Sequence, residues 1–96
     1  MDRFQHTVIF RLNDGVDEEW FLDQARTLAD LPGVQDFEVL EQVSTKTEQF
    51  RFALSMWFHD AAGHAAYDAN PSHIDYVQNI WLPNVAEFVE LDYIRR

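Results

Sequence analysis

The chain contains no cysteine, and this absence excludes several kinds of chemistry at once. Without thiols it can form no disulfide bond, no iron–sulfur cluster, no Cys-ligated zinc site and no cysteine nucleophile. Glycine is scarce as well, and its three occurrences, Gly15, Gly33 and Gly63, are far apart. Glycines so scattered cannot form a phosphate-binding or dinucleotide-binding loop. The sequence therefore predicts no bound cofactor.

Basic residues are few: seven Lys and Arg stand against 17 Asp and Glu, which gives a net charge of −10. Nucleic acids and anionic membranes bind proteins through basic patches, so neither is an expected partner. Long apolar runs are missing too, and none approaches the ~18 residues of a membrane span. The first strand begins at Phe4, which leaves no room for a signal peptide and predicts a cytoplasmic protein.

Aromatic side chains, in contrast, are abundant: the 96 residues include eight Phe, three Trp and three Tyr. The length is typical of one domain, and no linker, repeat or low-complexity segment divides the chain. Residues 1–96 are therefore predicted to form a single domain. Because one small core can hardly enclose so many rings, we expect some of them to face a partner chain or to line a pocket.

Four segments alternate in polarity with the period of two that is typical of β-strands. They cover residues 4–12, 34–43, 50–58 and 87–95. Residues 18–31 and 61–69 are predicted helices, and a further helix follows the Asn70-Pro71 break. The order strand, helix, strand, strand, helix pair, strand predicts an α+β, ferredoxin-like βαββαβ fold. Such a fold has a four-stranded antiparallel sheet with helices on one face.

The third predicted strand, residues 50–58, is bulky and apolar on both faces. Phe52 and Leu54 lie on one face, and Ala53 and Trp57 lie on the other. A strand of this kind is covered on both sides, but the helices of one chain can cover only one face of the sheet. We therefore predict a homodimer formed through the sheet face.

The segment from Tyr67 to His73 ends one helix and begins the next. Asn70 is a favoured N-cap, and Pro71 is tolerated at the first helical position. Such a break can direct a phenol and an imidazole into the same space, whereas a straight helix would place them on different faces. Both side chains could instead be structural, with His73 bonding backbone groups in the break and Tyr67 packing its ring.

The other histidines give weaker signals. His6 lies on the more apolar face of the first strand, where a lone histidine is usually a hydrogen-bonded core residue. Asp92 could orient a histidine from its strand, although acids at strand ends are usually solvated. His59 and His64 are on a strand and a helix, and their spacing matches no zinc motif. No metal site is predicted.

Several short motifs follow one another in order along nearly the whole chain. They are His6-Thr7-Val8-Ile9-Phe10-Arg11-Leu12, Leu31-Pro32-Gly33-Val34, Phe37-Glu38-Val39, Phe52-Ala53-Leu54-Ser55-Met56-Trp57-Phe58, Tyr67, Asn70-Pro71-Ser72-His73 and Asp92-Tyr93. In content and order they resemble the stress-responsive dimeric α/β-barrel family, often called Dabb. Members of this family form homodimers in which two sheets face each other and close a barrel. The resemblance thus implies the same dimer as the third strand does.

One plant branch of that family comprises polyketide cyclases, which close a linear polyketide by an aldol reaction. There a Tyr-x-x-His-Pro-x-His motif supplies a tyrosine and a histidine, and the first strand supplies another histidine. Tyr67, His73 and His6 match these positions. Asn70 and Phe52 depart from the pattern, because each stands where the branch has a further histidine. The chain therefore has the central pair, Tyr67 and His73, but the two departures imply a less polar pocket than that of the cyclases.

Three functions are therefore open. In the main prediction, a stress-responsive-type protein binds a small apolar or aromatic ligand between sheet and helices, with His6, Tyr67 and His73 as polar contacts. The apolar contacts would be Val8, Phe10, Phe52, Leu54 and Phe88. In the second, the protein is a cofactor-independent cyclase or lyase in which His73 is the base, Tyr67 the donor and His6 a positioning group. In the third, the cavity is closed and the protein is a structural dimer.

Overall fold

A computed structural model describes residues 3–44 and 49–96. The elements are β1 (Phe4–Leu12), α1 (Glu18–Arg26), the 3-10 helix η1 (Thr27–Asp30), β2 (Gln35–Glu41), β3 (Phe52–Phe58), α2 (Ala61–Ala69), α3 (Pro71–Tyr76), the π-helical turn η2 (Val77–Trp81), α4 (Leu82–Asn84) and β4 (Val85–Ile94). The strands form a four-stranded antiparallel sheet in the order β2-β3-β1-β4. The predicted ferredoxin-like βαββαβ fold is confirmed.

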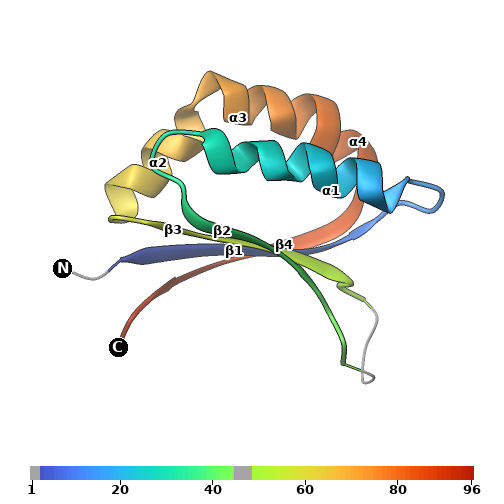
Figure 1. Ribbon diagram of the computed structural model, residues 1–96, viewed down its shortest axis with the longest axis horizontal. Coiled ribbons are helices and arrows are strands. Elements are labelled where there is room, and N and C mark those ends of the chain that lie inside the picture. The colour runs from blue at the N-terminus through green and yellow to red at the C-terminus, as the bar shows by residue number, and fades with distance from the viewer. Residues whose placement is uncertain (1–2, 45–48) are drawn as a thin grey trace.

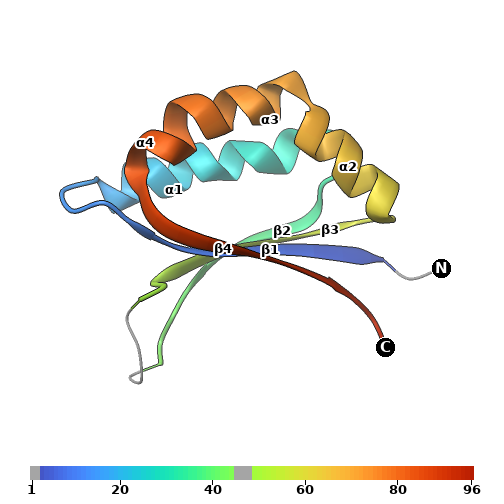
Figure 2. The ribbon, with the colours of Figure 1, turned by 180° about the vertical axis from the view of Figure 1, so that it is seen from behind.

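The sheet has one covered and one uncovered face. The helices of the described chain all lie on the same side of the sheet (Figure 1), and the view from behind shows the same two layers (Figure 2). The core lies between these layers, where Phe10, Phe21 and Phe58 are fully buried. Successive strand residues point to opposite faces, so alternate residues of β1 and β3 enter this core. Within the described ranges, no helix is long and apolar enough to cross a membrane.

Cap and turn residues set where the helices begin and end. The Asp17 carboxylate accepts a hydrogen bond from the backbone N–H of Trp20 at 3.1 Å, and Asp60 does the same for Gly63 at 2.8 Å. Both bonds satisfy N–H groups that have no partner within the helix. After η1 the chain turns at Gly33, whose φ of +87° is a conformation that favours glycine.

The boundaries of β2, β3 and β4 differ from the predicted ones by one or two residues. β2 ends at Glu41, although the alternation continues to Val43, which is 93% exposed. β3 begins at Phe52 instead of residue 50, and β4 begins earlier than predicted, at Val85, which pairs with Leu12 beyond a register shift. Alternation indicates which residues can form a strand, but pairing with the neighbouring strand decides where it stops.

Candidate functional site

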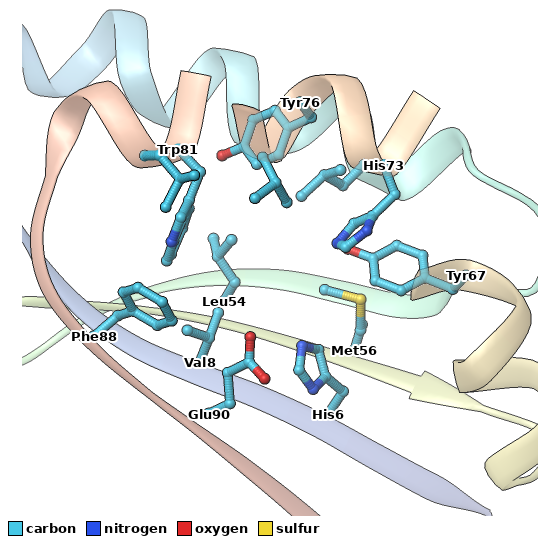
Figure 3. A pocket seen from close by; sticks show the side chains of 13 residues that line it. His6, Val8, Leu54, Met56, Tyr67, His73, Tyr76, Trp81, Phe88 and Glu90 are labelled. Atoms are coloured by element: carbon cyan, nitrogen blue, oxygen red, sulfur yellow. The ribbon is translucent and has the colours of Figure 1, made fainter. Parts of the chain in front are cut away.

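A cavity of about 80 Å³ lies between the sheet and the helices (Figure 3). Its floor comes from β1, β3 and β4, and its roof comes mainly from α2, α3 and η2. The walls are mostly apolar and include Val8, Leu54, Met56, Trp81 and Phe88. A water molecule needs roughly 10–15 Å³ measured in this way. The cavity therefore has room for several waters, or for the reacting part of a small molecule.

Six of the eight residues predicted for the site line this cavity. They are His6, Val8, Leu54, Tyr67, His73 and Phe88. Phe10 and Phe52 do not line it. They are 0% and 3% exposed, and their rings pack against each other in the core with centroids 5.9 Å apart. Both lie on the correct face of the sheet, but farther along their strands, so they support the site from within the core.

The break between α2 and α3 brings Tyr67 and His73 together. The Asn70 side chain accepts a hydrogen bond from the backbone N–H of Ser72 at 2.8 Å, and Pro71 is the first residue of α3. The chain therefore changes direction between the two helices, and the ring centroids of Tyr67 and His73 lie 4.3 Å apart. Figure 3 shows both rings at the same end of the cavity, where one bound group could contact both.

His73 is held by a backbone group in this break. Its Nδ1 lies 3.2 Å from the carbonyl oxygen of Asp68. Because a carbonyl oxygen can only accept, Nδ1 carries the hydrogen in the neutral ring and Nε2 keeps its lone pair. His73 thus makes the hydrogen bond to a backbone group of the break that the sequence analysis considered as its structural role. It also fixes the tautomer in which Nε2 can accept a proton.

His6 is held in the same tautomer by a carboxylate. His6 and Asp92 are directly opposite each other on β1 and β4, and Nδ1 of His6 lies 2.7 Å from Oδ1 of Asp92. The interpretation that Asp92 orients a histidine is therefore confirmed. His6 is buried, at 6% exposure. When Nδ1 donates to the carboxylate, Nε2 is the acceptor, and one ring nitrogen of His6 faces the cavity in Figure 3.

Two buried tyrosines, Tyr67 and Tyr76, are among the residues that line the cavity. Burial raises the pKa of Tyr67, and Asp68, Tyr76 and Glu90 shift it in the same direction, so the phenol stays protonated and can donate a hydrogen bond. Burial also raises the pKa of Tyr76. The Tyr76 hydroxyl oxygen is buried and has no hydrogen-bond partner within residues 3–44 and 49–96. Leaving such a group unpaired costs about 1–3 kcal/mol.

Reasoning from the sequence missed seven residues of the cavity: Leu28, Met56, Tyr76, Val77, Trp81, Leu82 and Glu90. Glu90 could have been found, because it follows Phe88 on the same face of the last strand. Trp81 belongs to η2, and residues 77–81 form a π-helical turn where an ordinary helix was predicted. Such turns are often found at functional sites, but the apolar spacing of the segment does not distinguish them from an α-helix.

The cap at Asn70 gives a testable prediction for the break. Replacing Asn70 with alanine should lower the free energy of unfolding by about 1 kcal/mol, because the backbone N–H of Ser72 loses its partner. Urea denaturation followed by circular dichroism measures this change. Asn70→Asp is the matched control and should retain the stability, since aspartate caps helices equally well. Equal stability of the Ala and Asp variants would contradict a capping role for Asn70.

These features define a ferredoxin-like α+β protein with a small, partly polar cavity under its helices. The family described as Stress Responsive A/B Barrel Domain (Dabb) matches residues 4–95, so the chain belongs to this family. A Dabb family protein with a ferredoxin-like fold from Mesorhizobium loti is 35% identical, with a TM-score of 0.92 and coverage of 100% of this chain and 99% of that one. The resemblance found in the sequence is confirmed.

Two more distant structures share the fold. A dimeric ferredoxin-like protein of unknown function from Thermobifida fusca is 21% identical, with a TM-score of 0.80 and coverage of 98% of this chain and 92% of that one. A hydroxynitrile lyase from Passiflora edulis is 16% identical, with a TM-score of 0.88 and coverage of 99% and 94%. At these identities the likeness concerns the fold alone. Among curated proteins, none matches the chain.

Proposed function

We propose that the cavity binds a small, uncharged carbonyl compound and catalyses proton transfer at the carbon next to the carbonyl group, as a cofactor-independent lyase or cyclase does. The observation that carries this proposal is the proximity of a histidine whose tautomer is fixed to a tyrosine that stays protonated. His73 keeps its lone pair on Nε2 because Nδ1 bonds to the backbone of Asp68. The donor is the protonated hydroxyl of Tyr67, and the centroid of the Tyr67 ring lies 4.3 Å from that of the His73 ring.

The lining of the cavity limits the class of ligand. Among the described residues that line it, none is Lys or Arg, so an anionic ligand would find no countercharge. Glu90 adds a carboxylate to the wall and would repel an anion (Figure 3). The volume of about 80 Å³ also limits the enclosed part to a few heavy atoms. A compact ketone or aldehyde with an aromatic or apolar substituent fits these limits better than a long polyketide does.

In the proposed reaction His73 is the base and Tyr67 is the hydrogen-bond donor. Nε2 of His73 removes a proton from the α-carbon, and the electron pair of the C–H bond forms the enolate as negative charge moves to the carbonyl oxygen. Tyr67 donates a hydrogen bond to that oxygen, and such donors act most strongly where charge develops in an apolar site. The enolate then takes the proton back or attacks a second carbonyl carbon in an aldol step. The lyase from Passiflora edulis makes carbonyl chemistry a natural class to test on this fold.

Exchange of α-protons for deuterium tests this proposal without knowledge of the natural substrate. Small neutral ketones and aldehydes such as acetophenone, benzoylacetone and phenylacetaldehyde are incubated with the protein in D₂O and followed by ¹H NMR. We expect saturable acceleration of exchange for at least one compound. Tight binding without exchange would support a binding protein instead, and the absence of both would support a structural role.

We also propose that the protein is a homodimer joined through the uncovered face of its sheet. That face carries Leu40, Val89 and Tyr93, which are 43%, 40% and 51% exposed, and Ile9 and Trp57, which are partly exposed. A continuous apolar patch of this kind usually marks an interface, and the Thermobifida fusca relative is dimeric.

Analytical ultracentrifugation should accordingly give twice the mass of the chain. The variant Val89→Arg should sediment as a monomer at the same concentration, because it places a charge within the apolar patch. Ile74→Arg is the matched control: Ile74 is 43% exposed but lies on α3, on the other side of the sheet, so this variant should stay dimeric. A monomeric wild-type protein would contradict the dimer.

A further inference from the structure

A second cluster of polar side chains lies at the edge of the cavity and has no complete role in the proposed reaction. It consists of His6, His64 and Asp92, which come from β1, α2 and β4. One ring nitrogen of each histidine and one carboxylate oxygen of Asp92 all lie within 4.8 Å of one another. Two histidines and a carboxylate in such proximity are a set of groups that binds transition metals.

His64 is the unusual member of this cluster. Its ring is 4.8 Å from that of Phe4 and 4.5 Å from that of His6, measured between centroids. Its Nε2 is buried and makes no hydrogen bond within the described ranges; the nearest carboxylate, that of Asp68, is 3.5 Å away. A buried nitrogen left unpaired costs about 1–3 kcal/mol. An ion that took its lone pair would remove this cost.

The electrostatic surroundings favour a cation. The carboxylates of Asp68, Asp92 and Glu90 all act on His64, and each attracts positive charge. Neutral imidazole is the form of histidine that binds metal ions.

We propose that His6, His64 and Asp92 bind one divalent transition-metal ion, of which zinc is the representative. Zinc lies about 2.0–2.2 Å from nitrogen and oxygen ligands, so tetrahedral ligand atoms are roughly 3.3–3.5 Å apart. Ligand atoms separated by the full 4.8 Å must therefore approach each other by roughly 1.3–1.5 Å, which rotation of the side chains can supply. Nitrogen and oxygen ligands without thiolate suit zinc, cobalt, nickel or copper, whereas calcium and magnesium prefer oxygen alone.

The ion would change the state of His6. The hydrogen bond between Nδ1 of His6 and Asp92, 2.7 Å between the heavy atoms, would be lost if both atoms became ligands, and the hydrogen of the neutral ring would move from Nδ1 to Nε2, because the nitrogen that binds a metal carries no hydrogen. Three protein ligands also leave a coordination position for water or a bound molecule, as in open zinc sites. Since His6 lines the cavity, that position would lie beside the ligand space. This site goes beyond the proposed proton transfer, which uses His73 and Tyr67.

Isothermal titration calorimetry with zinc on the metal-free, full-length protein tests this inference, and the visible absorption of added Co²⁺ reports the number of ligands. We expect one ion per chain. His64→Gln and Asp92→Asn should each weaken zinc binding at least tenfold. His59→Ala is the matched control: His59 is exposed at the end of β3, so this variant should bind zinc as the wild type does.

A further variant distinguishes failure of the metal site from failure of the proposed reaction. His73→Ala should slow proton exchange about 10²–10⁴-fold and leave zinc binding unchanged. Circular dichroism confirms that each variant is folded, and ¹⁵N shifts of the imidazole nitrogens in the wild type show directly whether zinc binds His6 and His64. The inference is overturned if these shifts do not change with zinc, or if zinc binds equally to wild type, His64→Gln and Asp92→Asn.

Discussion

Replacing His73 with alanine should slow the exchange of α-protons about 10²–10⁴-fold, the range found when a general base is removed. The reason is geometric: His73 meets Tyr67 at one end of the cavity and is fixed with the lone pair on Nε2. Initial rates of exchange in D₂O at saturating ketone, followed by ¹H NMR, measure the loss. His59→Ala removes an exposed histidine outside the cavity and should keep the wild-type rate.

The stability of the His73→Ala variant separates a chemical role from a structural one. His73 also bonds to the carbonyl of Asp68, so its removal should lower the free energy of unfolding by about 1 kcal/mol. A folded variant that exchanges protons within threefold of the wild-type rate would remove His73 as the base. His6 would then be the alternative base, since Asp92 leaves it an acceptor nitrogen of the same kind.

Replacing Tyr67 with phenylalanine should lower the same rate about 10²–10³-fold, the loss found when one donor to a developing oxyanion is deleted. Phenylalanine keeps the ring that packs against Phe58, with centroids 5.1 Å apart, so the change removes little besides the hydroxyl. The NMR exchange assay at several ketone concentrations separates kcat from KM. We expect the effect in kcat, because the hydrogen bond to the oxygen strengthens as the enolate forms.

Tyr93→Phe is the matched control for this hydroxyl, because Tyr93 is on the uncovered face of the sheet and 51% exposed. Its rate should equal that of the wild type. An increase in KM at unchanged kcat in Tyr67→Phe would mean that the hydroxyl only binds the ketone, and the donor role would be wrong. A binding protein without catalysis would then be the better description.

Most of the fold could be predicted because its rules are local. The alternation of residues 4–12 and the capping residues Asp17, Asp60 and Asn70 determine local structure that tertiary packing then preserves. The observed bounds of β1 and α2 equal the predicted ones. The ends of β2 and β3 were predicted less well, because there the strand pairing, and not the polarity of the residues, decides which residues belong to the sheet.

The candidate site could be predicted where strand alternation sets the face, as for His6, Val8, Leu54 and Phe88, or where its residues are close in sequence. Tyr67 and His73 lie on either side of one helix break, and the capping preference of Asn70 and the position of Pro71 predict that break. His6, His64 and Asp92 come from three elements, and only the packing of the helices on the sheet brings them within 4.8 Å. No spacing along the chain encodes that arrangement, and for this reason neither the cluster nor the role of His64 could be predicted.

β1 belongs to two surfaces at once, since His6 and Val8 line the cavity while the residues between and beyond them, such as Thr7 and Ile9, face the uncovered side. Substitutions on one side therefore need not alter the side chains on the other. Under the proposed function, relatives that share this scaffold can change the ligand of the cavity during evolution and keep the same dimer. The converse also holds, because a new mode of assembly can arise without redesign of the chemistry.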